Sequence, residues 1–305
     1  MKRRDFLVKG AGLGVAGALV PHFGGLNAVG LPAEKGNYDV VAVRGGEAVD
    51  MFDKVMESLG GMEKFVKSGQ KVLIKPNIGW DVPPERAGNT NPELIGRIVE
   101  SVLDAGASEV VIFDHTCDQW DRCYRNSKIE ETARKKGAKV VPGNDESFFE
   151  EVSIPDGKSL KTAKVHRELL ESDVFINVPI LKHHSSTTVS LSMKNLMGVV
   201  WDRGFYHGND LSQCIADFLT YKKPDLNIID GYRMLKKNGP RGVSVSDVVD
   251  LKAMIAGSDI VAVDAAATKM FGREPNDINH IRIAHEMGLG NINLDELSID
   301  RVKMG

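Results

Sequence analysis

The densest group of residues that could do chemistry lies in residues 173–201, DVFINVPILKHHSSTTVSLSMKNLMGVVW. An apolar, strand-like run there leads into Lys182, His183 and His184, and Lys194 and Asn195 soon follow. Ammonium groups bind anions, while imidazole serves as a general acid or base or as a metal ligand. Adjacent side chains of an extended segment point in opposite directions, so at most one of the two histidines is expected to face a given site.

Polar residues also follow three further strand-like runs at the point where each run ends. The run KVLIK ends at Lys75 and continues to Asn77, EVVIFD ends at Asp114 and His115, and LNIID ends at Asp230. Because the carboxyl ends of parallel strands meet at one edge of a sheet, where open sheets bind ligands, these side chains are expected to converge on one crevice. The alternative is that they mark where strands meet solvent, with Asp114 and Asp230 capping the turns that follow.

Residues 193–200 have a helical pattern in which Met193, Leu196, Met197 and Val200 make one buried stripe. Lys194 lies about 100° around this helix from Met193, beside the stripe. Partial desolvation there is expected to lower the pKa of its amine and make it reactive. The alternative is a charged residue that only borders the core.

Three sets of roles follow from these patterns. The candidate catalytic residues are Lys194, His183 and Lys75; the candidate binding residues for an anion or cofactor are Asn77, Asp114, Lys182, Asn195, Gly198 and Asp230; the candidate metal ligands are His184 and His115. Gly198 is included because it lacks a side chain, so backbone or ligand can approach closely there. The cofactor is not identified by these patterns, and a divalent metal ion is one candidate.

The elements that must position these residues alternate between strands and helices. Strands are predicted at residues 38–44, 71–75, 109–114, 139–142, 174–179, 187–191, 226–230, 252–256 and 298–303, and helices at 47–59, 91–105, 129–136, 193–200, 210–221, 259–271 and 278–287. Residues 77–91, 115–127 and 231–246 are predicted to be irregular. The alternation predicts an α/β fold with a mostly parallel sheet and helices on both faces, in a single domain over residues 38–303. A small antiparallel excursion is predicted around residues 143–165.

Residues 1–30 resemble a twin-arginine export signal of the bacterial type followed by a linker. Arg3 and Arg4 are followed by Asp-Phe-Leu and then by a short, mildly apolar run rich in Gly and Ala. The alternative is an ordinary basic, amphipathic N-terminus. Such a signal predicts that the folded protein crosses the membrane through the twin-arginine translocase and resides in the periplasm or another extracytoplasmic space.

Composition limits the classes of function. The 305 residues are 42% apolar and 27% charged with a formal net charge of -3, so nothing indicates a nucleic-acid surface. No run of 18 or more apolar residues is present, which predicts no membrane span in the mature protein. Cys117, Cys123 and Cys214 match no iron-sulfur spacing, so no such cluster is expected from this chain. For Cys117 and Cys123, a small disulfide and free thiols both remain open.

Several segments together resemble a known family. They are IKPNIG, NTNPELI, EVVIFD, LKHHSSTTVSLSMKNLMGVV, IIDG and GSDIVAVDAAATKMFG. The likeness as a whole covers nearly the whole mature chain, from about residue 38 to residue 272. They look like the bacterial and archaeal family called domain of unknown function 362. Some members of that family carry a ferredoxin-like iron-sulfur module, and this chain lacks the cysteines for one.

A more distant similarity connects the chain with the nickel-pincer lactate racemases. Residues 172–200 are similar to the S-G-G-x-K segment of those enzymes, in which the lysine anchors the cofactor, although Ser192 and Met193 stand where the paired glycines would be. The residues Asp114-His115-Thr116 are similar to the start of their D-H-T-R-P segment, with Cys-Asp in place of Arg-Pro. The resemblance implies common ancestry and leaves a shared reaction open.

The sequence leads to two hypotheses. In the first, the chain is an exported α/β enzyme or cofactor protein that binds an anionic small molecule at the carboxyl edge of its sheet. Lys75, Lys182 and Lys194 would supply positive charge, and His183 or His184 would act as acid, base or metal ligand. In the second, it is a non-catalytic periplasmic binding or accessory protein that uses the same crevice.

Overall fold

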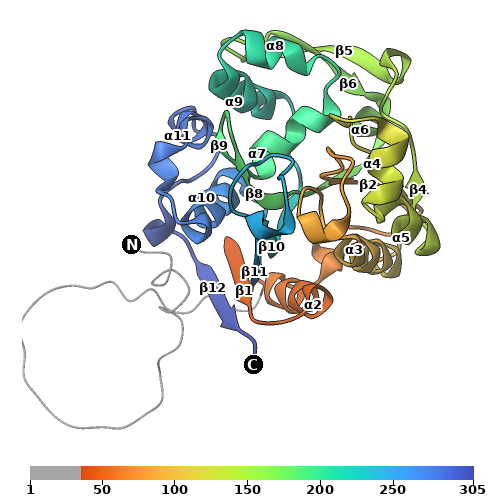
Figure 1. Cartoon of the computed structure of the whole chain (residues 1–305), viewed down its shortest axis with the longest axis vertical. Helices are drawn as coiled ribbons and strands as arrows, with labels where there is room; N and C mark the ends of the chain where they lie inside the picture. Colours follow the sequence, from red (N-terminus) through yellow and green to blue (C-terminus); the bar gives the residue numbers. More distant parts are fainter. Residues whose placement is uncertain (1–35) are drawn as a thin grey trace, which may run out of the picture.

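The computed structural model describes residues 36–305, so the proposed export signal at residues 1–30 lies outside the described residues. The strands are β1 (Val40–Arg44), β2 (Lys71–Pro76), β3 (Glu109–Ile112), β4 (Lys139–Val140), β5 (Phe149–Ser153), β6 (Thr162–His166), β7 (Val174–Val178), β8 (Ile180–His184), β9 (Thr188–Ser190), β10 (Leu226–Leu235), β11 (Val248–Gly257) and β12 (Ile299–Lys303). The helices are α2 (Ala48–Leu59), α3 (Pro92–Asp104), α4 (Trp120–Asn126), α5 (Ile129–Lys135), α6 (Arg167–Glu171), α7 (Ser192–Asn195), α8 (Arg203–Gly208), α9 (Leu211–Tyr221), α10 (Ile260–Phe271) and α11 (Asn279–Glu286) (Figure 1).

The main sheet has the strand order β12-β1-β11-β10-β7-β2-β3-β4, and β8 and β9 extend it beside β10. All neighbouring pairs along this order are parallel except the two that involve β11, which runs antiparallel to both β1 and β10. Strands β2, β3 and β7 therefore bring their carboxyl ends to one edge of the sheet. The predicted mostly parallel sheet is confirmed.

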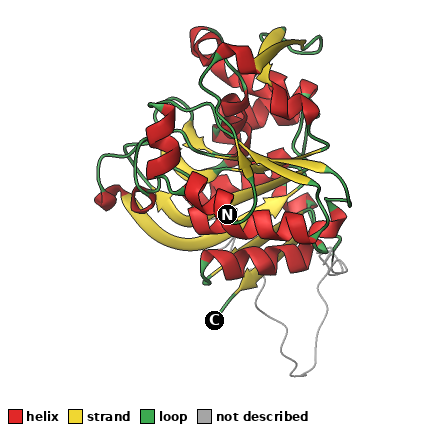
Figure 2. Ribbon diagram, turned by 90° about the vertical axis from the view of Figure 1, so that its right-hand side faces the viewer, coloured by secondary structure: helices red, strands yellow, loops and turns green. Residues whose placement is uncertain are grey.

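Alternation along the strands divides the core into two layers, one on each face of the sheet. Val72 and Ile74 of β2 belong to a core cluster shared with α2, α3 and α5, whereas Leu73 belongs to a cluster shared with α7, α9, α10 and α11. Because successive side chains of a strand point to opposite faces, helices must cover both faces. Figure 2 shows the strands lying between these helical layers. The prediction of helices on both faces is confirmed.

Local signals explain where several helices begin and end. Asn91 accepts a hydrogen bond from the backbone N–H of Glu93 through Oδ1, and Pro92 occupies the first turn of α3. Gly60 ends α2 with a φ of 98°, a left-handed conformation in which glycine carries no steric cost. Both boundaries lie within a residue or two of their predicted places.

A separate two-stranded antiparallel sheet, β5 with β6, forms the excursion predicted around residues 143–165. In Figure 1 this sheet and α8 lie at the same end of the molecule. The excursion is joined to the rest of the fold by a bridge between Val165 and Val200 and by the hydrogen bond from the Trp201 N–H to the Lys164 carbonyl. It therefore reaches the segment that follows α7.

The prediction of irregular structure was wrong in part for residues 115–127 and for residues 231–246. Residues 120–126 form α4. The N-cap residue of this helix, Gln119, makes no side-chain capping hydrogen bond, so the sequence carries no start signal for it. Residues 231–235 continue β10 past Asp230, with a register shift between Gly231 and Arg233. A Cβ on Gly231 would lie 2.9 Å from the Ala253 carbonyl oxygen of β11, so glycine here permits close strand pairing instead of ending the strand.

Within residues 36–305, none of the helices combines the length and the apolar character that crossing a bilayer requires. All three cysteines, Cys117, Cys123 and Cys214, are free thiols, with Cys117 exposed and the other two buried. Cys117 and Cys123 therefore form no disulfide in this structure.

Candidate functional site

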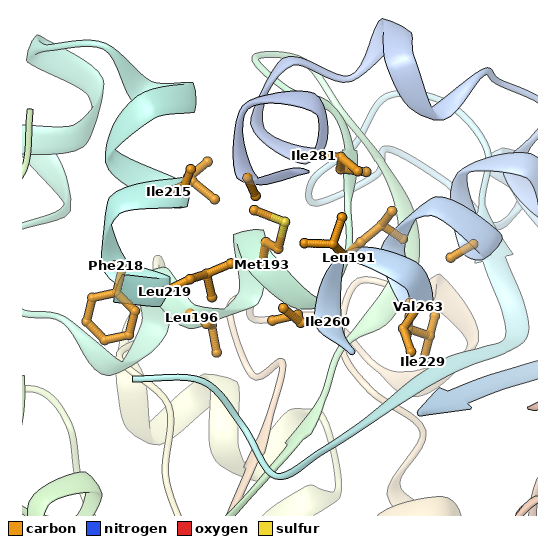
Figure 3. Close-up of a cluster of buried hydrophobic side chains, with 14 of the residues drawn as sticks. Leu191, Met193, Leu196, Ile215, Phe218, Leu219, Ile229, Ile260, Val263 and Ile281 are labelled. Atoms are coloured by element: carbon orange, nitrogen blue, oxygen red, sulfur yellow. The ribbon is translucent and has the colours of Figure 1, made fainter. Parts of the chain in front are cut away.

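The short helix α7 and the 3₁₀ turn Leu196–Val199 that follows it are fixed by an apolar core on one side. Figure 3 shows Met193 and Leu196 among Ile215 and Leu219 of α9 and Ile260 of α10, and all five side chains are buried. Met197 and Val200, the other members of the predicted stripe, are buried as well, although the helix predicted over residues 193–200 ends at Asn195 and continues as the 3₁₀ turn. Because this side packs into the core, the other side of α7 presents Lys194 and Asn195 toward the carboxyl edge of the sheet.

Asp264 of α10 holds the first turn of α7. Its two carboxylate oxygens accept hydrogen bonds from the backbone N–H groups of Ser192, at 2.7 Å, and Met193, at 2.9 Å. These N–H groups have no intrahelical acceptor, so the carboxylate satisfies donors that would otherwise be unpaired in the core. Burial raises the pKa of Asp264 to about 7, and the N–H donors oppose part of that rise.

Lys75 and Asp114 form a buried ion pair at the carboxyl ends of β2 and β3. Lys75 Nζ lies 2.8 Å from Asp114 Oδ1, and the side chains are only 1% and 3% exposed. Nζ also donates hydrogen bonds to the Pro76 carbonyl, at 2.8 Å, and to Asn195 Oδ1, at 2.9 Å. Asp114 Oδ2 accepts from the Ile78 N–H at 2.7 Å. Burial lowers the pKa of Lys75, and the Asp114 carboxylate counteracts part of that shift.

Two asparagines connect this pair to a second lysine. Asn195 Oδ1 accepts from Asn77 Nδ2 at 2.9 Å as well as from Lys75. Asn77 Oδ1 in turn accepts from Lys182 Nζ at 2.9 Å, and Lys182 Nζ also donates to the Gly88 carbonyl at 2.7 Å. The network fixes the positions of both ammonium groups, because each polar atom has a directional partner.

Gly198 makes room for the ion pair. A Cβ placed on it would overlap Asp114 Oδ1 and would lie 2.6 Å from Lys75 Nζ. The Gly198 carbonyl accepts a hydrogen bond from the His115 N–H at 2.9 Å, which holds the glycine backbone against the ion pair. The expected close approach at Gly198 is thus made by buried charged side chains of the protein itself.

A cavity of about 70 Å³ opens beside this network. Eight residues singled out from the sequence line it: Asn77, Asp114, His115, Lys182, His184, Lys194, Asn195 and Gly198. These residues come from the ends of β2 and β3, from β8 and from α7 with its following turn. The convergence of polar residues at the carboxyl edge is therefore present in the structure, and it forms one small pocket.

The cavity carries excess positive charge. Burial lowers the pKa of Lys182 to about 7 and that of Lys194 to about 8. Neither ammonium has a carboxylate oxygen within 4.0 Å among residues 36–305; Lys194 Nζ lies 3.0 Å from Met197 Sδ instead. Asp114 is the one acidic side chain in the described lining, and it is already paired with Lys75.

The histidines behave differently from one another. His184 lines the cavity, accepts the Ser186 N–H through Nδ1 at 3.0 Å, and has a pKa lowered to about 3 by burial and nearby cations. His183 points elsewhere and accepts the Gly239 N–H at 3.1 Å, so it does not line the cavity. His115 Nδ1 lies 2.9 Å from the Val200 carbonyl, which requires a proton on Nδ1 and leaves Nε2 as an acceptor.

No group of three or more His, Cys, Asp and Glu side chains within residues 36–305 is arranged to hold a metal ion. His184 and His115 both line the cavity, and the third donor that a typical metal centre requires is not a His, Cys, Asp or Glu of the described chain. Metal binding by these two histidines stays a prediction from the sequence.

Asp230 lies away from this cavity. Its Oδ2 accepts the Asn91 N–H at 2.8 Å and its Oδ1 accepts the Tyr232 N–H at 3.0 Å. Burial raises its pKa to about 6, while both N–H donors favour the ionised form. Asp230 therefore orders the backbone at the start of α3 and in β10, as the turn-capping alternative supposed.

Sequence reasoning missed five side chains of the cavity lining: Trp80, Cys117, Ser190, Arg203 and Pro240. Trp80 and Cys117 follow the ends of β2 and β3 by only a few residues in the sequence, and this short separation could have indicated that they line the cavity. Arg203 belongs to α8, a short helix containing two glycines that was not predicted. Its guanidinium donates to the carbonyls of His115, at 2.9 Å, and Thr116, at 2.6 Å, and lies 3.2 Å from Cys117 Sγ.

Comparisons with known proteins found a matching family model, a curated protein of similar sequence and a solved structure of similar fold. The model of a family described as "Domain of unknown function (DUF362)" matches residues 72–269. The thylakoid-associated protein sll1697 of Synechocystis sp. is 26% identical over 243 residues, which cover 77% of this chain and 73% of that protein. The structure of the lactate racemase apoprotein from Thermoanaerobacterium thermosaccharolyticum matches with a TM-score of 0.46 and 11% identity, over 73% of this chain and 55% of the racemase chain. The chain thus spans about half the length of that racemase, and a similarity at this TM-score supports no argument about activity.

Proposed function

The chain belongs to the family described as "Domain of unknown function (DUF362)", and from that premise we propose that its cavity binds a small oxyanion. One observation carries the proposal. Lys182 and Lys194 line a small cavity without a carboxylate partner among residues 36–305, and the only acidic side chain of that lining, Asp114, is paired with Lys75.

The free-energy cost of two buried ammonium groups without a counter-ion favours an anion as the ligand of this cavity. A buried ammonium without a counter-ion costs free energy, which is why the pKa values of Lys182 and Lys194 are lowered. A carboxylate, sulfate or phosphate in the cavity would supply the missing counter-charge and would raise both pKa values toward their ordinary range. The cavity volume of about 70 Å³ suits the anionic group of a ligand.

Catalysis of a proton transfer is the second candidate function, and it rests on the same two lysines. Amines with pKa values of about 7 and 8 exist in both protonation states near neutral pH, which is the condition for a general acid or base. Lys182, which has the lower pKa of the two, is the more readily deprotonated before a ligand binds and is the better general base, and Lys194 is the better general acid. In the alternative, a non-catalytic binding protein, both lysines only bind.

A thermal-shift series tests the binding proposal. Sulfate, phosphate and acetate, each compared with chloride at equal ionic strength, are expected to raise the melting temperature of the wild-type protein, because a ligand that binds only the folded state stabilises it. Lys182→Met and Lys194→Met are expected to lose the shift. Lys135→Met is the matched control, because Lys135 is exposed and pairs with Glu131 on the surface of α5. Equal shifts in all three variants would remove the basis of the proposal.

We propose in addition that the protein is exported in folded form through the twin-arginine pathway. Support comes from Arg3 and Arg4 and from the mildly apolar run that follows them. The test is fractionation of a bacterial host that has the translocase. Wild-type protein is expected in the periplasm, and the double variant Arg3→Lys, Arg4→Lys in the cytoplasm, with Lys9→Gln as a control that keeps both arginines. Wild-type protein that stays in the cytoplasm would contradict the proposal.

A further inference from the structure

A second and much larger cavity adjoins the cavity that is lined by Lys182 and Lys194, which we call the lysine cavity. Its volume is about 700 Å³, and it lies between residues 159–164, which include the start of β6, and residues 200–206, which include most of α8. Figure 1 places β6 and α8 at the same end of the molecule. Sequence patterns do not indicate this cavity, because the pattern around residues 143–165 is weak and no helix is predicted at residues 203–208.

Two side chains belong to both cavities. His115 and Arg203 line the large cavity and the lysine cavity, so the two spaces meet at these side chains. The Arg203 guanidinium donates to main-chain carbonyls and has no carboxylate within 4.0 Å among residues 36–305. The boundary at which the two cavities meet is therefore itself cationic.

The large-cavity side of this boundary is aromatic. The Trp201 ring stacks on His115 with a centroid separation of 4.8 Å and an interplanar angle of 7°. Phe205, which also lines the large cavity, is 40% exposed and is one of four large apolar side chains exposed in residues 36–305. Aromatic surface that remains uncovered at the rim of a cavity is typical of a ligand contact.

A polar group in the same lining also lacks a partner. Tyr206 is 1% exposed and lines the large cavity, and its Oη has no hydrogen-bond partner among residues 36–305. A buried hydroxyl without a partner is costly, so a group that could pair with it would be stabilised there. The large cavity thus offers aromatic surface, and the Tyr206 hydroxyl lies buried behind its lining without a partner among residues 36–305.

We infer that one ligand occupies both cavities: an oxyanion with an aromatic body. Its carboxylate or phosphate lies with Lys182 and Lys194, and its ring lies past Arg203 against Trp201 and Phe205. The inference rests on the proposed anion binding, because the lysine cavity of about 70 Å³ holds an anionic group but not a ring as well. The cavity of about 700 Å³ has room for the rest of the molecule.

Paired probes test this inference by calorimetry. Phenyl phosphate is compared with inorganic phosphate, and phenylacetate with acetate, so that each pair shares its anionic group and differs by the ring. In at least one pair the ring is expected to tighten binding about tenfold, a typical gain for a buried aromatic contact. Phe205→Ala is expected to remove most of that gain and to leave the affinity for the ringless anion within about twofold. Leu170→Ala is the control, because Leu170 is 38% exposed and lies outside both cavities.

The outcomes separate this inference from the proposal on which it rests. If phosphate or acetate binds and the ring adds nothing in either pair, the extended ligand is refuted and anion binding stands. If the ring tightens binding equally in wild type and Phe205→Ala, the ring lies elsewhere and the inference is also refuted. If neither the anions nor their aromatic partners bind, both proposals fail. Loss of all binding in Lys182→Met together with a ring gain that depends on Phe205 is the supporting result.

Discussion

Replacing Gly198 by alanine is the sharpest single perturbation of the buried network. The added Cβ would overlap Asp114 Oδ1 and would lie 2.6 Å from Lys75 Nζ, both of which belong to one ion pair. The backbone offers little relief, because the Gly198 carbonyl is held by the His115 N–H. The Gly198 φ is not in the left-handed region, so the backbone itself accepts alanine and the effect is steric.

The magnitude follows from the burial of the pair. Lys75 and Asp114 are 1% and 3% exposed, so neither charge reaches water when the methyl group pushes them apart. Separating a buried ion pair costs about 3–5 kcal/mol, because each charge is left without its partner in a medium of low polarity. We therefore expect Gly198→Ala to lower the free energy of unfolding by about 3–5 kcal/mol and to abolish anion binding.

Urea unfolding, with anion binding measured on the same samples, checks this expectation. Gly208→Ala is the matched control, because a Cβ on Gly208 meets nothing within 4 Å and Gly208 also lies in a helical segment outside the left-handed region. The control is expected within about 0.5 kcal/mol of wild type, as is usual for surface substitutions. A Gly198→Ala protein as stable as the control, with unchanged anion affinity, would refute the close packing of the ion pair against Gly198.

Three further predictions concern neighbouring groups. Asp264→Ala is expected to cost about 2–4 kcal/mol in urea unfolding, because two buried N–H groups of α7 lose their acceptor; an unchanged midpoint would contradict this role. Burial lowers the pKa of His184 from its ordinary value of 6.5 to about 3. Between these two pH values the unfolded chain binds a proton at His184 and the folded chain does not, so the free energy of unfolding falls as the pH falls. From about pH 6.5 to pH 5 this histidine should account for about 1.6 kcal/mol of the loss, which His184→Asn should abolish; equal losses in both proteins would refute it. Iodoacetamide should label the native protein once, at exposed Cys117, because burial protects Cys123 and Cys214 and raises their pKa values to about 12 and 11; labelling of all three thiols, or of none, would contradict the structure.

Much of the fold could be predicted because its elements carry strong local signals. The runs that became β2, β3 and β7 are short and apolar, and α3 begins at an asparagine cap followed by proline. The failures were elements without such signals. Helix α4 lacks a capping hydrogen bond, α8 has only six residues and contains two glycines, and β10 continues through Gly231 because the neighbouring strand comes close there.

The site was predictable only as far as chain position determines it. Asn77 and Asp114 meet because they follow the ends of the parallel strands β2 and β3, which lie on one edge of the sheet. Lys182 of β8 and Asn195 of α7 complete the lining from segments that follow β7 in the chain. The sequence does not predict which partner each side chain takes. The ion pair of Lys75 with Asp114, for example, needs the space that Gly198 leaves, and Gly198 belongs to a distant segment of the chain. Asp230 also follows a strand end, yet its carboxylate binds two backbone N–H groups and does not face the cavity.

The most direct test of the central proposal is proton-linked calorimetry of anion binding. The heat of binding of sulfate or acetate, neither of which titrates near neutral pH, is measured in two buffers of different ionisation enthalpy. The difference between the two heats gives the number of protons that the protein takes up on binding. The pKa values of Lys182 and Lys194 in the free protein are about 7 and 8, so part of each amine is deprotonated before the anion binds. If the bound anion keeps both amines protonated, the protein should take up about 1.4 protons on binding near pH 8 and about 0.1 near pH 6. Lys182→Met and Lys194→Met should each lose binding or reduce the uptake near pH 8. Absence of binding, or binding near pH 8 without proton uptake, would contradict the assignment of Lys182 and Lys194 as the anion site.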